Sequence, residues 1–130
     1  MNSETILIVD DEPVVREFCC STLARAGYQI LQAATAEQAL EVWSRNRQLI
    51  DLALVDVSLG RDTSAPIADE LIARKVPFAF VTGYSDTAVL PEHLRKMPRL
   101  SKPYVLADVR RIIARLLEEQ PGLCRSASAS

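Results

Sequence analysis

The sequence lacks a long apolar run, a block of basic residues and a regular cysteine pattern. No apolar run approaches the roughly 20 residues that cross a bilayer. The stretch "MNSETILIVDDE" has neither the basic region nor the cleavage site of a signal peptide. Cys19 and Cys20 are adjacent and Cys124 is distant, a spacing that fits neither a disulfide framework nor a zinc site. We therefore expect a cytoplasmic location, no membrane contact and reduced thiols.

The net charge is low, because basic and acidic residues are nearly equal in number and are mixed along the chain. The formal net charge is -2 over 130 residues, and lysine and arginine are scattered, which argues against binding to nucleic acid through charge alone. A chain of this length buries about two thirds of the surface of its unfolded form, which is enough for one core. We expect one domain over residues 1–119. Residues 120–130, "QPGLCRSASAS", follow a helix and are small and polar, so they are predicted to form a disordered tail.

Short apolar runs alternate with stretches of helical apolar spacing. The alternation predicts an α/β fold with a doubly wound, five-stranded parallel sheet, right-handed crossovers and helices on both faces. The stretch from Gly83 to Met97 contains Pro91 and is predicted to be a loop or a short, frayed helix. The expected strands are Ile6 to Val9, Ile30 to Ala33, Leu52 to Val55, Phe78 to Val81 and Arg99 to Ser101, and the expected helices are "PVVREFCCSTLARAG", "TAEQALEVWSRNR", "PIADELIARK" and "VLADVRRIIARLLEE".

Polar residues stand at the ends of four of these strands. Asp10 and Asp11 follow the first strand, Asp56 ends the third, Thr82 ends the fourth and Lys102 follows the fifth. Ligands of doubly wound sheets bind outside the carboxyl ends of the strands, so the five residues are expected to face one site. Three carboxylates there repel each other by about 4 kcal/mol per pair at 4 Å in a partly buried setting. Their oxygen-only donor set suits Mg²⁺.

These residue types suit a site that accepts a phosphoryl group. A metal ion and a lysine neutralise the charge on the phosphoryl oxygens, a threonine hydroxyl donates a hydrogen bond, and an aspartate attacks in line. Asp56 is the predicted nucleophile because the apolar run "LALV" holds it on a central strand. The alternative is structural: Asp10 or Asp11 could cap the helix that begins near Pro13, and the lysine could be an ordinary solvated residue.

The motifs "ILIVDDEP", "LALVDVSLG", "FAFVTGY" and "LSKPY" occur in an order and spacing that resemble a response-regulator receiver domain of two-component signalling, over about residues 4 to 119. The resemblance implies a flavodoxin-like fold with strand order 2-1-3-4-5. It also implies roles for single residues: Asp56 as the phosphorylation site, Asp11 and Asp56 as direct Mg²⁺ ligands, Asp10 as a ligand through water, the backbone carbonyl of Ser58 as a further ligand, Thr82 as the switch hydroxyl, Lys102 as the phosphate-binding lysine and Pro103 as a cis proline.

One subgroup is more similar still: the single-domain receivers often called the FAT GUY type, which share "PFAFVTGY" and "PRLSKPY" apart from Val81 in place of alanine. The chain departs from most receivers at Arg99, where they carry an aromatic switch residue three positions before the lysine. We therefore expect the segment from Gly83 to Met97 to order or shift on phosphorylation. Ser58 and Tyr84, two residues after Asp56 and Thr82, are expected to flank the phosphoryl group and to control water access to it; the alternative is that both are ordinary surface loop residues.

The function that this resemblance implies is that of a stand-alone response regulator. It would accept a phosphoryl group on Asp56 from a sensor histidine kinase or a histidine phosphotransferase, and would signal through an unknown downstream protein or act as a phosphate sink. No enzyme activity is expected beyond its own phosphorylation and dephosphorylation. One alternative is a receiver-like binding module that is never phosphorylated. Another is a phosphatase of the haloacid dehalogenase type, but that type has an acid where this chain has Ser58.

Overall fold

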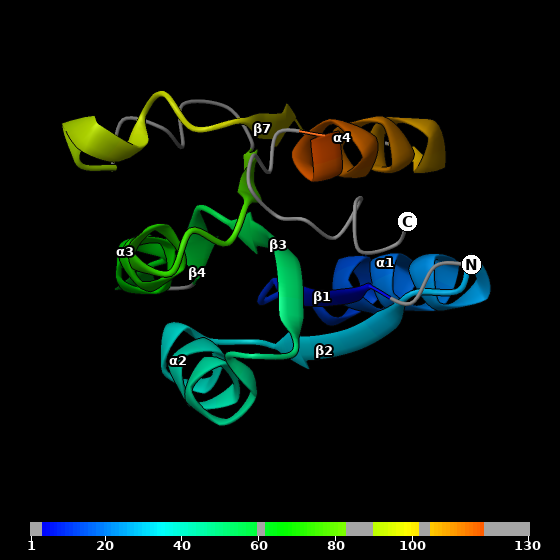
Figure 1. Ribbon diagram of the computed structural model, residues 1–130, viewed down its shortest axis with the longest axis horizontal. Helices are drawn as coiled ribbons and strands as arrows, with labels where there is room; N and C mark the ends of the chain where they lie inside the picture. Colours follow the sequence, from blue (N-terminus) through cyan, green and yellow to red (C-terminus); the bar gives the residue numbers. More distant parts are fainter. Residues whose placement is uncertain (1–3, 60–61, 83–89, 102–104, 119–130) are drawn as a thin grey trace.

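The computed structural model describes residues 4–59, 62–82, 90–101 and 105–118 of the chain. Five parallel strands form the central sheet in the order β2-β1-β3-β6-β7 (Figure 1). This order is the predicted 2-1-3-4-5, and the doubly wound α/β fold is confirmed. The strands are β1 (Thr5–Val9), β2 (Gln29–Ala33), β3 (Ile50–Asp56), β6 (Phe78–Thr82) and β7 (Arg99–Ser101).

Two pairs of helices cover the two faces of the sheet (Figure 1). The helices α1 (Pro13–Arg25) and α4 (Leu106–Glu118) share one apolar cluster with the sheet, and α2 (Ala36–Asn46) and α3 (Ala65–Ala73) share the other. None of the helices in the described ranges is both long enough and apolar enough to cross a membrane.

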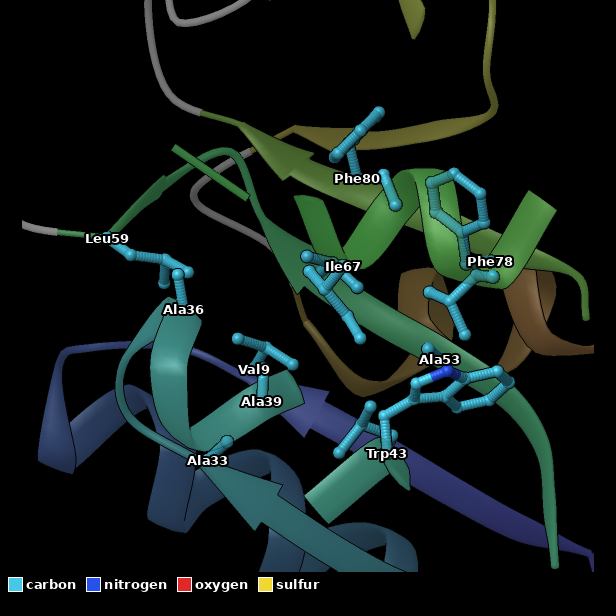
Figure 2. Packing of buried hydrophobic residues seen from close by; sticks show 14 of the residues in the cluster. Val9, Ala33, Ala36, Ala39, Trp43, Ala53, Leu59, Ile67, Phe78 and Phe80 are labelled. Carbon is cyan, nitrogen blue, oxygen red and sulfur yellow. The ribbon is translucent and has the colours of Figure 1, made fainter. Parts of the chain in front are cut away.

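The apolar strands are buried on both faces because neighbouring side chains point in opposite directions. On β1, Ile6 and Ile8 belong to the cluster under α1 and α4, while Leu7 and Val9 belong to the cluster under α2 and α3. Figure 2 shows Val9 in that second cluster. The unbroken apolar runs of the sequence are therefore the inner strands of the sheet.

Helix α2 begins with a side-chain cap and carries a buried tryptophan. The Thr35 side chain accepts a hydrogen bond from the amide of Gln38 at 3.0 Å, and the Gln38 side chain accepts one from the amide of Ala34 at 2.9 Å. Trp43 is 2% exposed and belongs to the apolar cluster shown in Figure 2. Its indole Nε1 donates to Glu70 Oε1 of α3 at 3.2 Å. This contact joins the two helices on that face.

One feature was not expected from the sequence, and the described part of the segment from Gly83 to Met97 agrees with the expectation. A short antiparallel pair, β4 (Ser58–Leu59) and β5 (Asp62–Thr63), follows β3 and was not predicted, because two-residue strands leave no periodic pattern. In the segment expected to be a loop or a frayed helix, residues 83–89 lie outside the described ranges. The rest contains one 3₁₀ turn, η2 (Glu92–Leu94), which buries Leu94 completely.

Candidate metal centre at the carboxyl ends of the strands

Three aspartates meet at the carboxyl end of the sheet, as predicted. Asp10, Asp11 and Asp56 each place a carboxylate oxygen within 4.8 Å of the others. Strand register brings them together, because β1 lies beside β3 and Val9 pairs with Val55. Asp10 and Asp56 are each 3% exposed, whereas Asp11 is exposed. Two of the three aspartates are therefore buried, and the third lies at the surface.

Hydrogen bonds hold the backbone and the carboxylate of Asp10 in place. Its amide donates to the carbonyl of Ala33 at 3.1 Å, and its own carbonyl accepts from Arg16 Nη1 at 2.8 Å. Its Oδ1 accepts from the amide of Glu12 at 2.9 Å. Arg16 also donates from Nε to Gln32 Oε1 at 3.0 Å, so α1 is tied to the ends of both β1 and β2.

Arg16 is a residue that the sequence analysis missed. It lies on α1 rather than at a strand end, so the rule that ligands gather at the carboxyl ends of strands does not identify it. The sequence does contain one indication of this contact: a basic residue stands a few positions after the acids that follow the first strand. That signal is weak by itself, because charged residues on helices usually face solvent.

The cap interpretation of the two acids after β1 is wrong. Helix α1 begins at Pro13, which suits a first helical position, and its N-cap residue is Glu12. The Glu12 side chain makes no capping hydrogen bond. Since neither Asp10 nor Asp11 is the N-cap, helix capping does not account for these two acids.

The three carboxylates of the cluster repel one another, which favours a cation at this place. Carboxylates at about 4 Å repel each other by roughly 4 kcal/mol per pair near a protein surface, and a buried carboxylate also loses hydration. Oxygen donors alone, partly open to solvent, are the set that Mg²⁺ prefers, since this ion keeps several waters and takes one or two carboxylates. Asp10, Asp11 and Asp56 fit that description.

Thr82 is the fourth predicted residue that the structure places at this edge. It ends β6, the strand next to β3, and is 4% exposed. Asp56 pairs with Val81, so Thr82 lies one residue beyond the level of Asp56 on the adjacent strand. Thr82 in turn pairs with Ser101, the last residue of β7.

The roles of the other candidate residues stay predictions. Lys102, Gly83, Tyr84 and Pro103 lie outside the described ranges. Ser58 begins β4 directly after the bend at Val57. Arg99 begins β7, is exposed and donates from its guanidinium to the carbonyl of Arg95. Cys19 and Cys20 form no disulfide among the described residues, and burial is the main cause that raises the pKa of Cys20 to about 11.

Comparison with known proteins yields a family and several relatives. The model of the response regulator receiver domain matches residues 6–114. The sensor kinase CckA of Brucella abortus is 31% identical over 125 residues, which are 91% of this chain and 13% of that kinase. The chain thus spans a small part of that longer protein.

Solved structures agree with the fold. The solution structure of SdrG from Sphingomonas melonis Fr1 is 34% identical, covers 88% of this chain and 97% of its own, and has a TM-score of 0.75. The response regulator TrrA from Thermotoga maritima, solved in complex with Mg²⁺-BeF, is 26% identical, covers 87% of this chain and 98% of its own, and has a TM-score of 0.72.

Proposed function

This chain belongs to the response regulator receiver domain family, and from that premise we propose that Asp56 is the residue that accepts the phosphoryl group. Receiver domains are the phosphate-accepting part of two-component systems and receive the group from sensor kinases or phosphotransferases. The observation that carries the proposal is the convergence of Asp10, Asp11 and Asp56 beside Thr82. We infer the roles of the individual residues from their positions.

Asp56 suits the nucleophile because it is part of an inner strand of the sheet, whereas the other two acids follow a strand. It ends β3, which has β1 on one side and β6 on the other, whereas Asp10 and Asp11 follow the end of β1. In the proposed step, a carboxylate oxygen of Asp56 forms a bond to phosphorus as the bond from phosphorus to the donor imidazole nitrogen breaks. The imidazole then takes a proton.

The neighbouring residues would bind and orient the phosphoryl group. A Mg²⁺ ion, when bound, would neutralise part of the charge on the phosphoryl oxygens. We propose Asp11 and Asp56 as its direct ligands, Asp10 as a ligand through water and the Ser58 carbonyl as a further ligand. TrrA, solved with Mg²⁺-BeF, supports this choice of ion. The Thr82 hydroxyl would donate to a phosphoryl oxygen.

Lys102 would supply a second positive charge beside the phosphoryl group, and Pro103 would be a cis proline. Tyr84, with Gly83, would control access of water. These roles rest on the family resemblance. The end of β7 supports the placement of Lys102, because Ser101 pairs with Thr82 and Lys102 is the next residue in the chain.

We also propose that the switch uses the segment from Gly83 to Met97 rather than an aromatic residue at the position of Arg99. The exposed Arg99 side chain and its contact with the Arg95 carbonyl support this proposal. Leu90 and Leu94 anchor the described end of the segment in the cluster under α2 and α3. Removing either from the core would cost about 2 kcal/mol, so we expect a small shift of these residues rather than unfolding.

At the level of the whole protein, we propose a stand-alone regulator in the cytoplasm with its receiver domain over residues 1–119. It would act on a downstream protein, without binding nucleic acid or membrane, or serve as a phosphate sink. Its chemistry would be limited to its own phosphorylation and dephosphorylation. The 34% identity to SdrG over 88% of this chain supports the receiver domain in this proposal.

The test is amide NMR during titration with Mg²⁺ and then beryllofluoride, a phosphoryl mimic, for wild type, Asp56→Asn and Asp51→Asn. Asp51 is the matched control because it is an aspartate at the opposite end of the same strand. We expect Mg²⁺ shifts around the three acids in wild type and Asp51→Asn, with the beryllofluoride response lost only in Asp56→Asn. Intact mass after incubation with acetyl phosphate should show one added phosphoryl group, again absent only in Asp56→Asn.

Two results would contradict the proposal. If wild type shows no response to millimolar Mg²⁺, the acids do not form a metal site, and the chain is a receiver-like binding module. If Asp56→Asn still gains a phosphoryl group under conditions that modify wild type once, another residue is the acceptor.

A further inference from the structure

Ser64 is a buried polar residue to which the proposed function gives no role. It is 0% exposed and stands between the short strand β5 and helix α3. The other buried polar or charged residues in the described part of the chain are Asp10, Asp56 and Thr82, all at the candidate metal centre. Burying a hydroxyl costs free energy unless it is hydrogen-bonded, so the partner of Ser64 indicates what this side chain does.

Ser64 occupies the N-cap position of α3 but does not cap the helix with its side chain. A serine at this position usually accepts a hydrogen bond from one of the first amides of the helix. The Ser64 side chain makes no such bond, and Thr63 Oγ1 instead accepts from the amide of Ala65 at 3.4 Å. Helix capping therefore does not account for the buried hydroxyl.

The Ser64 hydroxyl donates to the backbone carbonyl of Val57, the residue between Asp56 and Ser58. Its Oγ lies 3.3 Å from that oxygen, and the Ser64 amide donates to the same oxygen at 3.1 Å. The amide of Val57 donates in turn to the carbonyl of Val81 on β6 at 3.1 Å. Both polar groups of the Val57 backbone are therefore hydrogen-bonded, and the chain is held in place directly after Asp56.

The contact between Ser64 and Val57 also bears on the direction of the Ser58 carbonyl. Ser58 pairs with Thr63 in the antiparallel ladder of β4 and β5, and the bond from the Ser64 amide joins the two residues that flank this pair. Ser58 and Thr63 are therefore a non-hydrogen-bonded pair, in which the amide and the carbonyl of each residue point away from the partner strand. The Ser58 carbonyl can thus face a ligand outside the pair.

We propose that Ser64 is a positioning residue for the metal centre: its hydroxyl holds the Val57 carbonyl and thereby orients the Ser58 carbonyl as a Mg²⁺ ligand. This inference rests on the proposed function, in which the Ser58 carbonyl is a ligand. Removing a group that orients a metal ligand typically weakens metal binding by about 10- to 100-fold. The amide of Ser64 still holds Val57 when the hydroxyl is lost, so we expect the lower end of that range.

The test measures the Mg²⁺ dissociation constant of the full chain by amide NMR titration, without a phosphate donor, for wild type, Ser64→Ala and Thr35→Ala. Thr35 is the matched control because it is the N-cap of α2, and its hydroxyl does bind a helix amide. We expect Ser64→Ala to weaken Mg²⁺ binding by roughly tenfold. Thr35→Ala should change it by less than about twofold, although urea unfolding should show that the lost cap destabilises the protein.

A second measurement separates positioning from a general loss of structure. Phosphorylation by acetyl phosphate is followed by intact mass at increasing Mg²⁺ concentrations. Because Ser64 acts through a metal ligand, Ser64→Ala should raise the Mg²⁺ concentration at half the maximal rate by about tenfold, and the rate at saturating Mg²⁺ should stay within about twofold of wild type. Ser64→Gly, which also lacks the hydroxyl but keeps the amide, should show the same shift.

Three results would overturn the inference: wild-type Mg²⁺ affinity in Ser64→Ala and Ser64→Gly, equal weakening in Thr35→Ala, or a lower rate at saturating Mg²⁺ with no change in the half-saturating concentration. The wild type separates this inference from the proposed function. If wild type responds to Mg²⁺ and beryllofluoride and Ser64→Ala keeps full affinity, only the role of Ser64 is contradicted. If wild type shows no response to Mg²⁺, both are contradicted, because there is no metal centre for Ser64 to position.

Discussion

Acidic side chains interact differently at the two ends of the parallel sheet: one accepts a backbone hydrogen bond at the amino end, and three lie close to one another at the carboxyl end. At the amino ends, Asp51 Oδ2 accepts a hydrogen bond from the amide of Thr5 at 2.8 Å, so this acid joins β3 to β1. At the carboxyl ends, Asp10, Asp11 and Asp56 lie within 4.8 Å of one another. Aspartate therefore stabilises the sheet at its amino end. At the carboxyl end the three aspartates repel one another, and a bound cation would reduce that repulsion.

The largest effects on stability are expected from two separate variants, each of which neutralises one acid at one end of the sheet. Asp56→Asn should raise the free energy of unfolding by about 2 kcal/mol in the absence of Mg²⁺, because it removes repulsion among three carboxylates. Asp51→Asn should lower it by about 1 kcal/mol, because a charged acceptor becomes a neutral one. Urea unfolding in a chelating buffer measures both values. A loss of stability in Asp56→Asn would show that repulsion does not dominate at the carboxyl end.

The second prediction concerns Arg16, which holds the carbonyl of Asp10 at the carboxyl end. Arg16→Met should weaken Mg²⁺ binding by roughly tenfold, equivalent to about 1.4 kcal/mol, because the backbone that carries two of the acids is less firmly held. The Mg²⁺ dissociation constant is measured by NMR titration at a temperature where both proteins are folded.

Arg25→Met is the matched control for Arg16→Met. Arg25 is an exposed arginine in the last turn of the same helix, away from the acids. We expect its Mg²⁺ affinity to equal that of wild type. Equal weakening in both variants would show that helix charge, rather than the contact with Asp10, sets the affinity.

The sequence was sufficient to predict the acids at the carboxyl end but not the contacts that hold them. Apolar runs predict the ends of each strand to within two residues; the third strand, for example, was predicted to begin at Leu52 and begins at Ile50. The parallel topology then brings the carboxyl ends of the strands together. The contacts of Arg16 depend on how α1 is placed against β1 and β2. Side-chain partners of that kind leave no periodic signal.

The same reasoning explains why Asp51 was not singled out. It stands inside an apolar strand, where alternation predicts only which face a side chain points to. Its bond to the amide of Thr5 depends on the register shift between Thr5 and Ile6 in the pairing of β1 with β3. A tertiary irregularity of this kind becomes visible only in the structure.

The smallest effect is expected at the amino end, where Tyr28 titrates above its ordinary pKa of 10.0. Burial is the main cause, the Glu4 carboxylate raises the pKa further, and Arg110 opposes the shift. The raised pKa means that the native state holds its phenol proton more tightly than the unfolded state. This contribution to stability is complete below pH 10 and is lost as the pH rises through the native pKa.

Glu4→Gln should lower the pKa of Tyr28 toward 10.0 without restoring it fully, because burial remains. An ultraviolet titration of tyrosinate, with Tyr28→Phe to identify the signal, measures the change. Mg²⁺ should leave this titration unchanged, since Glu4 and Tyr28 lie at the opposite end of the strands from the three aspartates. A Mg²⁺-dependent shift of Tyr28 would mean that the two ends are coupled through the sheet, and the acids at the amino end would then belong to the same electrostatic system as the metal site.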